Sequence, residues 1–147
     1  MDRIDTVVCR HEGGAGFMAE ATGKLRGTPG VCFVTRGPGA TNAGIALHTA
    51  RQDSTPMLLF IGQVARDTRS REAWQEMDYR QVFGSVAKWV DEVDDLRRLP
   101  ELVSRAFHVA TAGRPGPVVL SLPEDLLAER EASPDAVARV APHVPVP

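Results

Sequence analysis

The stretch GVCFVTRGPGATNAG, residues 30–44, decides the fold, because it runs from an apolar strand through a glycine turn into a helix. Val31–Thr35 is a short β-branched and apolar run, which is typical of a strand buried on both faces. Ala40–Arg51 follows with apolar residues at helical spacing. A strand followed directly by a helix is the repeating unit of a parallel α/β sheet.

The same alternation continues along most of the chain. Helical spacing predicts three helices, over Gly14–Leu25, Ala40–Arg51 and Leu96–Ala112. Short apolar runs predict about five strands, over Thr6–Cys9, Val31–Thr35, Met57–Ile61, Ser85–Val90 and Val118–Leu122. Ala65–Phe83 is predicted to be a loop with a short helical piece, long enough to expect a function for it. We therefore expect an α/β fold with a doubly wound, mostly parallel sheet and helices on both faces.

Composition indicates a globular protein. The 147 residues are 43% hydrophobic and 24% charged, and we expect one domain over residues 1–127 followed by a polar, proline-rich linker or tail over 128–147. The net charge of -2 disfavours nucleic acid as a partner, and no apolar run approaches the roughly 18 residues of a membrane span.

The two cysteines, Cys9 and Cys32, are expected to be buried and to lie in a reducing compartment. No signal peptide is predicted at the start of the sequence, so we expect a cytoplasmic location.

Polar residues and glycines follow the predicted strands at three places. Ligands of open α/β sheets lie beyond the carboxyl ends of the strands, so these turns are the candidate sites. Glu12 is either a carboxylate that bonds a ring nitrogen or an acidic residue favoured by a helix N-terminus. Gly37–Gly39 is a turn before a helix, and Gln75 lies either in a pocket or in a solvated loop. The residues alone leave each alternative open.

Two common binding motifs are incomplete. A nicotinamide site needs a third glycine where Asn42 stands and an acidic residue where Gly62–Gln63 ends the next predicted strand, which makes an NAD-binding Rossmann protein the weaker alternative. A zinc-binding helix motif that begins with His-Glu needs a second histidine four residues after the first. His11-Glu12 does not fit this motif, because Ala15 stands at that position. No metal ligands are therefore predicted in this chain.

Five stretches taken together resemble one family. They are HEGGAGFMAEATGK (11–24), GVCFVTRGPGATNAG (30–44), PMLLFIGQV (56–64), AWQEMDYRQVFGSVAKW (73–89) and ATAGRPGPVVLSLPEDL (110–126). In this order and spacing they resemble the pyrimidine-binding domain of thiamine diphosphate enzymes of the acetolactate synthase type, from about Val8 to Leu127.

The resemblance implies a cofactor, a substrate class and roles for five residues. Glu12 would be a catalytic residue that bonds N1' of the aminopyrimidine ring of thiamine diphosphate, and Pro38, Gly39 and Asn42 would lie against that ring. Gln75 would be the second catalytic residue, reaching toward the reacting carbon of a 2-keto acid in a carboligation or decarboxylation. Such acid-base work requires a carboxyl group shielded enough to hold a proton near neutral pH, which an apolar pocket at a subunit interface would supply.

Two substitutions depart from the family pattern. Gly13 stands where the family commonly has glutamine, and Trp74 stands where it has phenylalanine. These leave the substrate and the reaction subtype open. FAD is also left open, since the family's flavin contacts lie mostly outside this segment.

The segment carries only part of the family pattern. The family's domain begins further upstream with a strand and a helix, and this sequence contains no Gly-Asp-Gly magnesium motif. The resemblance therefore implies that Mg2+ and the diphosphate are bound by another domain or subunit, that the isolated chain is inactive, and that an uncovered sheet edge favours a homo- or hetero-oligomer. The alternatives are a non-catalytic α/β interaction module and an inactive, truncated remnant.

Overall fold

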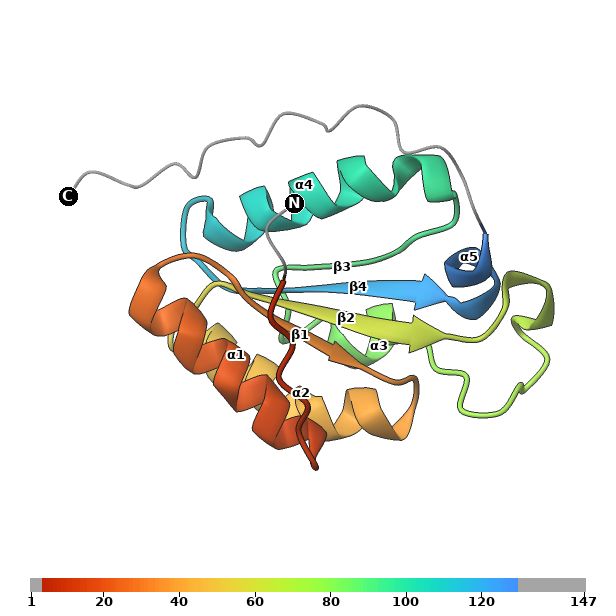
Figure 1. Cartoon of the computed structure of the whole chain (residues 1–147), viewed down its shortest axis with the longest axis horizontal. Coiled ribbons are helices and arrows are strands. Elements are labelled where there is room, and N and C mark those ends of the chain that lie inside the picture. Colours follow the sequence, from red (N-terminus) through yellow and green to blue (C-terminus); the bar gives the residue numbers. More distant parts are fainter. Residues whose placement is uncertain (1–3, 130–147) are drawn as a thin grey trace.

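The computed structural model describes residues 4–129, which form a parallel sheet with helices on both faces (Figure 1). The elements follow one another as α1 (Glu12–Arg26), β1 (Gly30–Val34), α2 (Pro38–Gln52), β2 (Met57–Gln63), η1 (Arg66–Thr68), α3 (Tyr79–Phe83), β3 (Trp89–Glu92), η2 (Leu96–Arg98), α4 (Leu99–Thr111), β4 (Pro117–Pro123) and α5 (Glu124–Ala128). The predicted α/β class is confirmed.

The four strands lie in the order β1-β2-β4-β3, and every pair is parallel. Along one row of the register Val31 lies opposite Leu58, and Leu58 lies opposite Val118. β4 is buried at every residue and β2 at all but Gly62. Continuous apolar runs therefore mark the two central strands, as burial on both faces requires.

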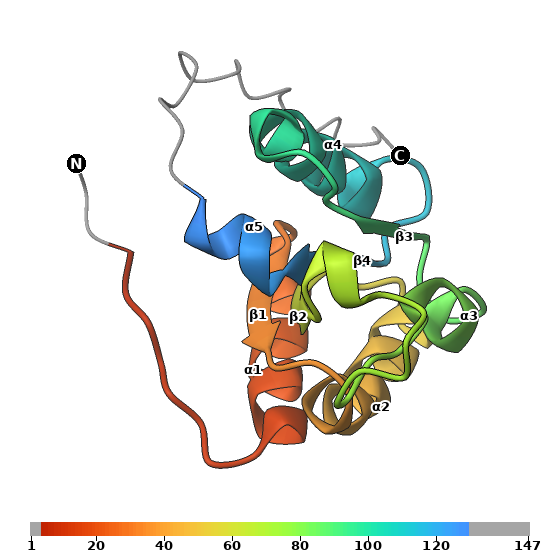
Figure 2. The ribbon, with the colours of Figure 1, turned by 90° about the vertical axis from the view of Figure 1, so that its right-hand side faces the viewer.

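Helices cover the two faces unequally (Figure 2). On one face, α1 and α2 pack against the sheet through a core that contains Leu47, Leu59 and Ile61. On the other face, α4 packs through Leu102 and other residues against Leu58, Phe60, Val118 and Leu120. The apolar residues of β1 that point to this second face, Val31 and Phe33, are exposed.

Glycines bring α1 unusually close to its neighbours. A Cβ atom on Gly16 would lie 2.7 Å from the Cβ atom of Ala46 in α2, and one on Gly23 would lie 2.1 Å from the carbonyl oxygen of Pro56. α1 then ends at Gly27, whose φ of 66° is the left-handed conformation that favours glycine. The start of α1 is thus held directly against α2.

The predicted strand at Thr6–Cys9 is wrong, because residues 4–9 contain no regular secondary structure. Val8 is 91% exposed, and no strand of the sheet pairs with this segment. An extended segment is stable as a strand only where a neighbour satisfies its backbone, and β-branched composition supplies no neighbour. Cys9 is likewise half exposed rather than buried, whereas Cys32 is buried.

The strand predicted at Ser85–Val90 begins later than expected, at Trp89. The backbone N–H groups of Val86 and Ala87 both return to the carbonyl of Phe83, which makes their stretch a turn. The loop with a short helical piece is confirmed, since Ala65–Phe83 contains only η1 and α3. The tail predicted at 128–147 lies outside the described residues from position 130 onward.

Candidate active site

Glu12 begins α1, beyond the carboxyl end of β1 and beside the first turn of α2. Its Oε2 atom accepts a hydrogen bond of 3.0 Å from Nδ2 of Asn42. This bond, with help from backbone N–H at the helix start, lowers the pKa of Glu12 below its ordinary value of 4.5. The half-buried carboxylate is therefore ionised near neutral pH in this chain, so the shielding expected of a general acid is not supplied by these residues.

Of the two glycines directly after Glu12, only Gly13 packs closely against α2. Nδ1 of His11 caps α1 by accepting a 3.0 Å hydrogen bond from the backbone N–H of Gly13. A Cβ atom on Gly13 would lie 3.3 Å from the carbonyl oxygen of Asn42, whereas one on Gly14 would meet nothing within 4 Å. The absence of a side chain at Gly13, as at Gly16, thus lets α1 approach α2 closely enough for Glu12 to reach Asn42.

The turn at Gly37-Pro38-Gly39 lies against the same carboxylate. Gly37 has a φ of 58°, and Pro38 begins α2, where a missing N–H costs nothing. A Cβ atom on Gly39 would lie 2.7 Å from Cγ2 of Thr35 and 3.4 Å from Oε1 of Glu12. Glycine at position 39 therefore keeps the space beside Oε1 open.

The loop that carries Gln75, residues 69–78 between η1 and α3, packs on the other side of this turn. A Cβ atom on Gly37 would lie only 2.8 Å from Cβ of Gln75, and Gln75 itself has a φ of 64°. Nε of Arg36 donates a 3.2 Å hydrogen bond to the carbonyl of Trp74. The structure thus brings Glu12, Asn42 and Gln75 to one glycine turn, although the 78% exposed Trp74 contacts solvent rather than a pocket.

Tyr79 joins the turn to the sheet and was not predicted from the sequence. Its hydroxyl accepts a 3.0 Å hydrogen bond from the backbone N–H of Gly37 and donates one of 3.2 Å to the carbonyl of Gly62. It is the chain's only tyrosine. Its place in an irregular segment gave no signal that it would lie beside Gly37.

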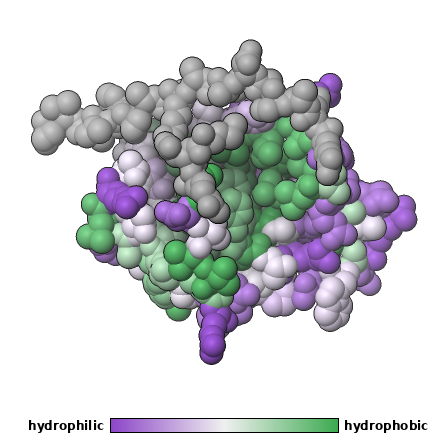
Figure 3. All heavy atoms as spheres, in the orientation of Figure 1, coloured by the Kyte–Doolittle hydropathy of each residue, from purple (hydrophilic) through white to green (hydrophobic). Residues whose placement is uncertain are grey.

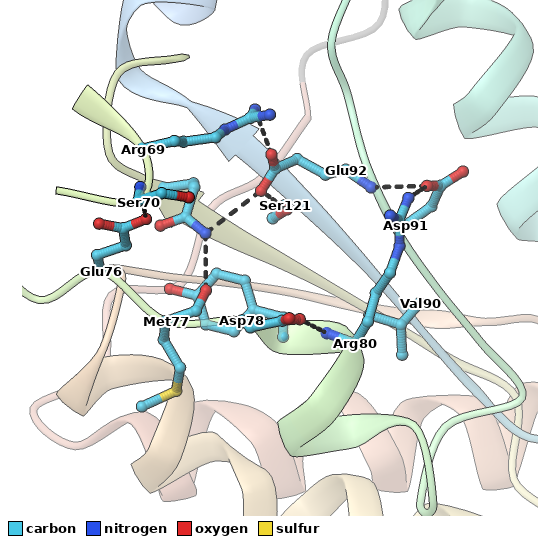
Figure 4. Close-up of a pocket in the computed structure, with 12 residues that line it drawn as sticks. Arg69, Ser70, Glu76, Met77, Asp78, Arg80, Val90, Asp91, Glu92 and Ser121 are labelled. Atoms are coloured by element: carbon cyan, nitrogen blue, oxygen red, sulfur yellow. Dashed lines mark hydrogen bonds and ion pairs between the residues drawn. The ribbon is translucent and has the colours of Figure 1, made fainter. Parts of the chain in front are cut away.

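Behind the Gln75 loop lies a polar cavity of about 240 Å³ (Figure 4). Two ion pairs line it: Arg69 pairs with Glu92, and Arg80 pairs with Asp91. The buried Ser121 donates a 2.8 Å hydrogen bond to Glu92. These contacts join the start of the Gln75 loop, α3, β3 and β4 beside the site.

A larger groove of about 610 Å³ opens between residues 4–12, α1 and β1. Apolar side chains gather in a hollow of the surface (Figure 3), and Val31 and Phe33 of β1 lie in the groove wall. Glu12 belongs to the same lining. The groove connects the candidate carboxylate with the uncovered part of the sheet.

Within residues 4–129, no three His, Cys, Asp or Glu side chains converge in a way that would hold a metal ion. In the same range, no helix has the length and apolar character needed to cross a bilayer.

Comparison with known proteins identifies the family. Residues 1–82, more than half of the chain, match the family model of the thiamine pyrophosphate enzyme N-terminal TPP binding domain. The chain is 44% identical over 125 residues, 85% of its length, to the mitochondrial acetolactate synthase catalytic subunit of Aspergillus candidus, covering 18% of that protein. It is 38% identical over 138 residues, 94% of its length, to the acetolactate synthase of Bacillus subtilis, covering 24% of that protein.

A third relative is the large subunit of acetolactate synthase isozyme 1 of Escherichia coli, 39% identical over 124 residues, which are 84% of this chain and 22% of that protein. The chain thus spans about a fifth of the length of the curated relatives that it matches. It belongs to the family of thiamine pyrophosphate enzymes, as a chain of their N-terminal TPP-binding domain.

Proposed function

We propose that this chain supplies the pyrimidine-binding half of a thiamine diphosphate enzyme that acts on 2-keto acids, in a carboligation or decarboxylation of the acetolactate synthase kind. The observation that carries the proposal is the carboxylate of Glu12, bonded to Asn42 through Oε2 and facing the Gly39 backbone through Oε1. This combination of one hydrogen-bonding group and a wall without side chains suits a flat heterocycle.

The residues of the chain fit such a ring. The space beside Oε1 would be narrowed by any side chain at position 39, so glycine is suited to a ligand lying there. When bound, thiamine diphosphate supplies a nucleophilic carbon for the carbonyl group of a 2-keto acid. In the proposal the Glu12 carboxylate would hold the ring and exchange a proton with its nitrogen N1', while Asn42 would orient that carboxylate through Oε2.

Gln75 has a different role in the proposal. Its backbone lies against Gly37, on the other side of the turn from Glu12. An amide side chain can both donate and accept hydrogen bonds, so Gln75 is suited to orienting the carboxylate or carbonyl oxygens of a substrate. This places acid-base work and substrate positioning on two different segments of one site.

The proposal requires a second protein unit. No metal-ligand cluster lies among residues 4–129, so the Mg2+ and the diphosphate would be held by another domain or chain. That unit would also shield Glu12, whose pKa is lowered here and must rise toward neutrality for proton exchange. The isolated chain is then inactive.

The open face of β1 is the proposed contact surface for association. Val31 and Phe33 are exposed there, and β1 pairs with β2 on one side only. Parallel sheets normally have both faces covered and avoid open apolar edges. We therefore expect the chain to associate with a second copy or with a partner subunit along β1.

The test is complementation. The chain is mixed with a diphosphate-binding domain of a relative, thiamine diphosphate and Mg2+, and turnover of a 2-keto acid is measured. Glu12→Gln is expected to lower turnover at least about 100-fold, because it removes the proton-exchanging group. Glu101→Gln is the matched control, since Glu101 is an exposed glutamate of α4. Turnover that Glu12→Gln leaves unaltered would contradict the proposal.

The second candidate is a non-catalytic interaction module, which the exposed apolar face of β1 favours. It predicts tight association with a partner but no keto acid turnover under the same conditions.

A further inference from the structure

The polar cavity behind the Gln75 loop is organised around one carboxylate, that of Glu92 at the end of β3 (Figure 4). Its Oε2 atom accepts hydrogen bonds from Oγ of Ser121, at 2.8 Å, and from Nε2 of Gln63, at 3.3 Å. Its Oε1 atom pairs with Nη2 of Arg69. Ser121 and Gln63 are both buried, so the carboxylate is fastened to the two central strands.

The same carboxylate reaches both ends of the loop that carries Gln75. Arg69 belongs to the beginning of this loop and contacts Glu92 directly. At the far end, Nε2 of Gln63 donates a 2.9 Å hydrogen bond to the carbonyl of Met77, two residues after Gln75. Glu92 therefore holds the start of the loop through its ion pair with Arg69. It also orients the Gln63 amide, which bonds to Met77 near the end of the loop.

The loop between these ends is strained and needs such fixing. Ser70, Glu72 and Gln75 all have φ angles between 54° and 64°, which non-glycine residues seldom adopt. The Glu76 carboxylate accepts hydrogen bonds from the backbone N–H groups of Ser70 and Ala73, at 2.7 and 3.2 Å. These bonds shape the loop internally, whereas the links to Glu92 tie its two ends to the sheet and the bond from Arg36 to the carbonyl of Trp74 ties its middle to the Gly37 turn.

We propose that Glu92 is a positioning residue of the candidate site: its contacts with Arg69 and Gln63 hold Gln75 against the Gly37 turn. This inference rests on the proposed function for the role of Gln75, but the placement of the loop is a property of the chain by itself. Arg69 supports it, since its guanidinium forms an ion pair with Glu92 through Nη2 at a partly buried position in the cavity wall.

The experiment measures loop placement in the whole chain without cofactor. Trp89→Phe leaves Trp74, the neighbour of Gln75, as the single tryptophan, and its fluorescence anisotropy reports local motion. In this background Glu92→Gln and Arg69→Gln are each expected to lower the anisotropy and to speed tryptic cleavage after the exposed Arg71 about tenfold. The double variant is expected to add nothing further, since both changes break one interaction.

Asp91→Asn is the matched control, because Asp91 is the neighbouring acidic residue of β3 and pairs with Arg80 of α3 instead of the loop. It is expected to leave both readouts within about twofold of the parent. The proposal is overturned if Glu92→Gln acts no more strongly than this control. It is also overturned if Glu92→Gln accelerates cleavage equally at sites throughout the chain, since Glu92 would then stabilise the fold as a whole.

Kinetics of the complemented enzyme separate this inference from the proposed function. If Gln75 orients the substrate, Glu92→Gln raises KM for the 2-keto acid in step with the loosened loop. A loosened loop with unchanged kinetics would remove the role of Gln75 and leave the positioning role of Glu92 in place.

Discussion

The two faces of the sheet differ most at β1. On one face Cys32 is buried beneath α1, in the same core as Leu59. On the other, its neighbour Phe33 is 68% exposed and stacks on Phe60 with ring centroids 4.7 Å apart. Of two adjacent residues of one strand, Cys32 thus lies in a packed core and Phe33 lies on an apolar surface that no helix of the described part of the chain covers. The difference teaches that the site is anchored through one face, while the other is available for association.

The largest expected difference is in the free energy of unfolding, when an apolar side chain is truncated to alanine on one face of the sheet or on the other. Leu59→Ala removes a fully buried side chain and is expected to lower the free energy of unfolding by about 2–5 kcal/mol. Phe33→Ala is expected to cost about 1 kcal/mol, because it loses mainly the contact with Phe60. Urea denaturation of both variants provides the comparison. Equal losses would mean that the two faces are packed alike.

Association adds a second readout for Phe33. Gel filtration of the unaltered chain at micromolar concentration is expected to show an oligomer, and Phe33→Ala is expected to shift it toward the monomer. A clean monomer of the unaltered chain would contradict association through the open face of β1.

A smaller effect is expected from glycines within α1. Gly23→Ala would place a methyl group 2.1 Å from the Pro56 carbonyl oxygen and should lower the free energy of unfolding by about 1–3 kcal/mol. Gly14→Ala meets nothing within 4 Å and should raise it by about 0.5–1 kcal/mol, since alanine favours the helix. Thermal or urea unfolding checks the opposite signs. Destabilisation by both would show that the free space beside position 14 does not determine the effect of a methyl group there.

The smallest effect concerns the cysteines. Burial raises the pKa of the Cys32 thiol to about 11, so Cys32 stays protonated and unreactive at pH 8, and its reactivity should grow as pH rises toward that value. Cys9 is half exposed and should react first with iodoacetamide. Mass spectrometry of Cys9→Ser and Cys32→Ser variants at pH 8 measures each thiol alone. Equal alkylation rates would show that the α1 face opens to solvent.

Much of the fold was predictable because its central strands are buried on both sides. Met57–Gln63 and Pro117–Pro123 contain continuous apolar runs that permit few other interpretations. Thr6–Cys9 has a similar composition but forms no strand, because pairing depends on a neighbour that composition does not reveal. The late start of β3 at Trp89 depends on backbone bonds to Phe83, which are equally invisible in the sequence.

The candidate site was predictable only in part. Local patterns left Glu12 and Gln75 with two interpretations each, and the family resemblance assigned their roles. The structure gathers them around Gly37 and Gly39, while their chemical roles stay predictions. Glu92 and Gln63 could not be found this way, since they lie 29 residues apart and meet only across the sheet.

The close contact between Gly16 and Ala46 has a consequence for engineering. Because no side chain separates α1 from α2 there, the spacing of the two helices also determines how far Glu12 stands from Asn42. A methyl group added at position 16 or a larger residue at position 46 would push the two helices apart and move Glu12 away from Asn42 without altering either residue. A change that adjusts the position of Glu12 in this way would also disturb the packing of the two helices, so the geometry of the candidate site and the stability of the fold could not be altered separately.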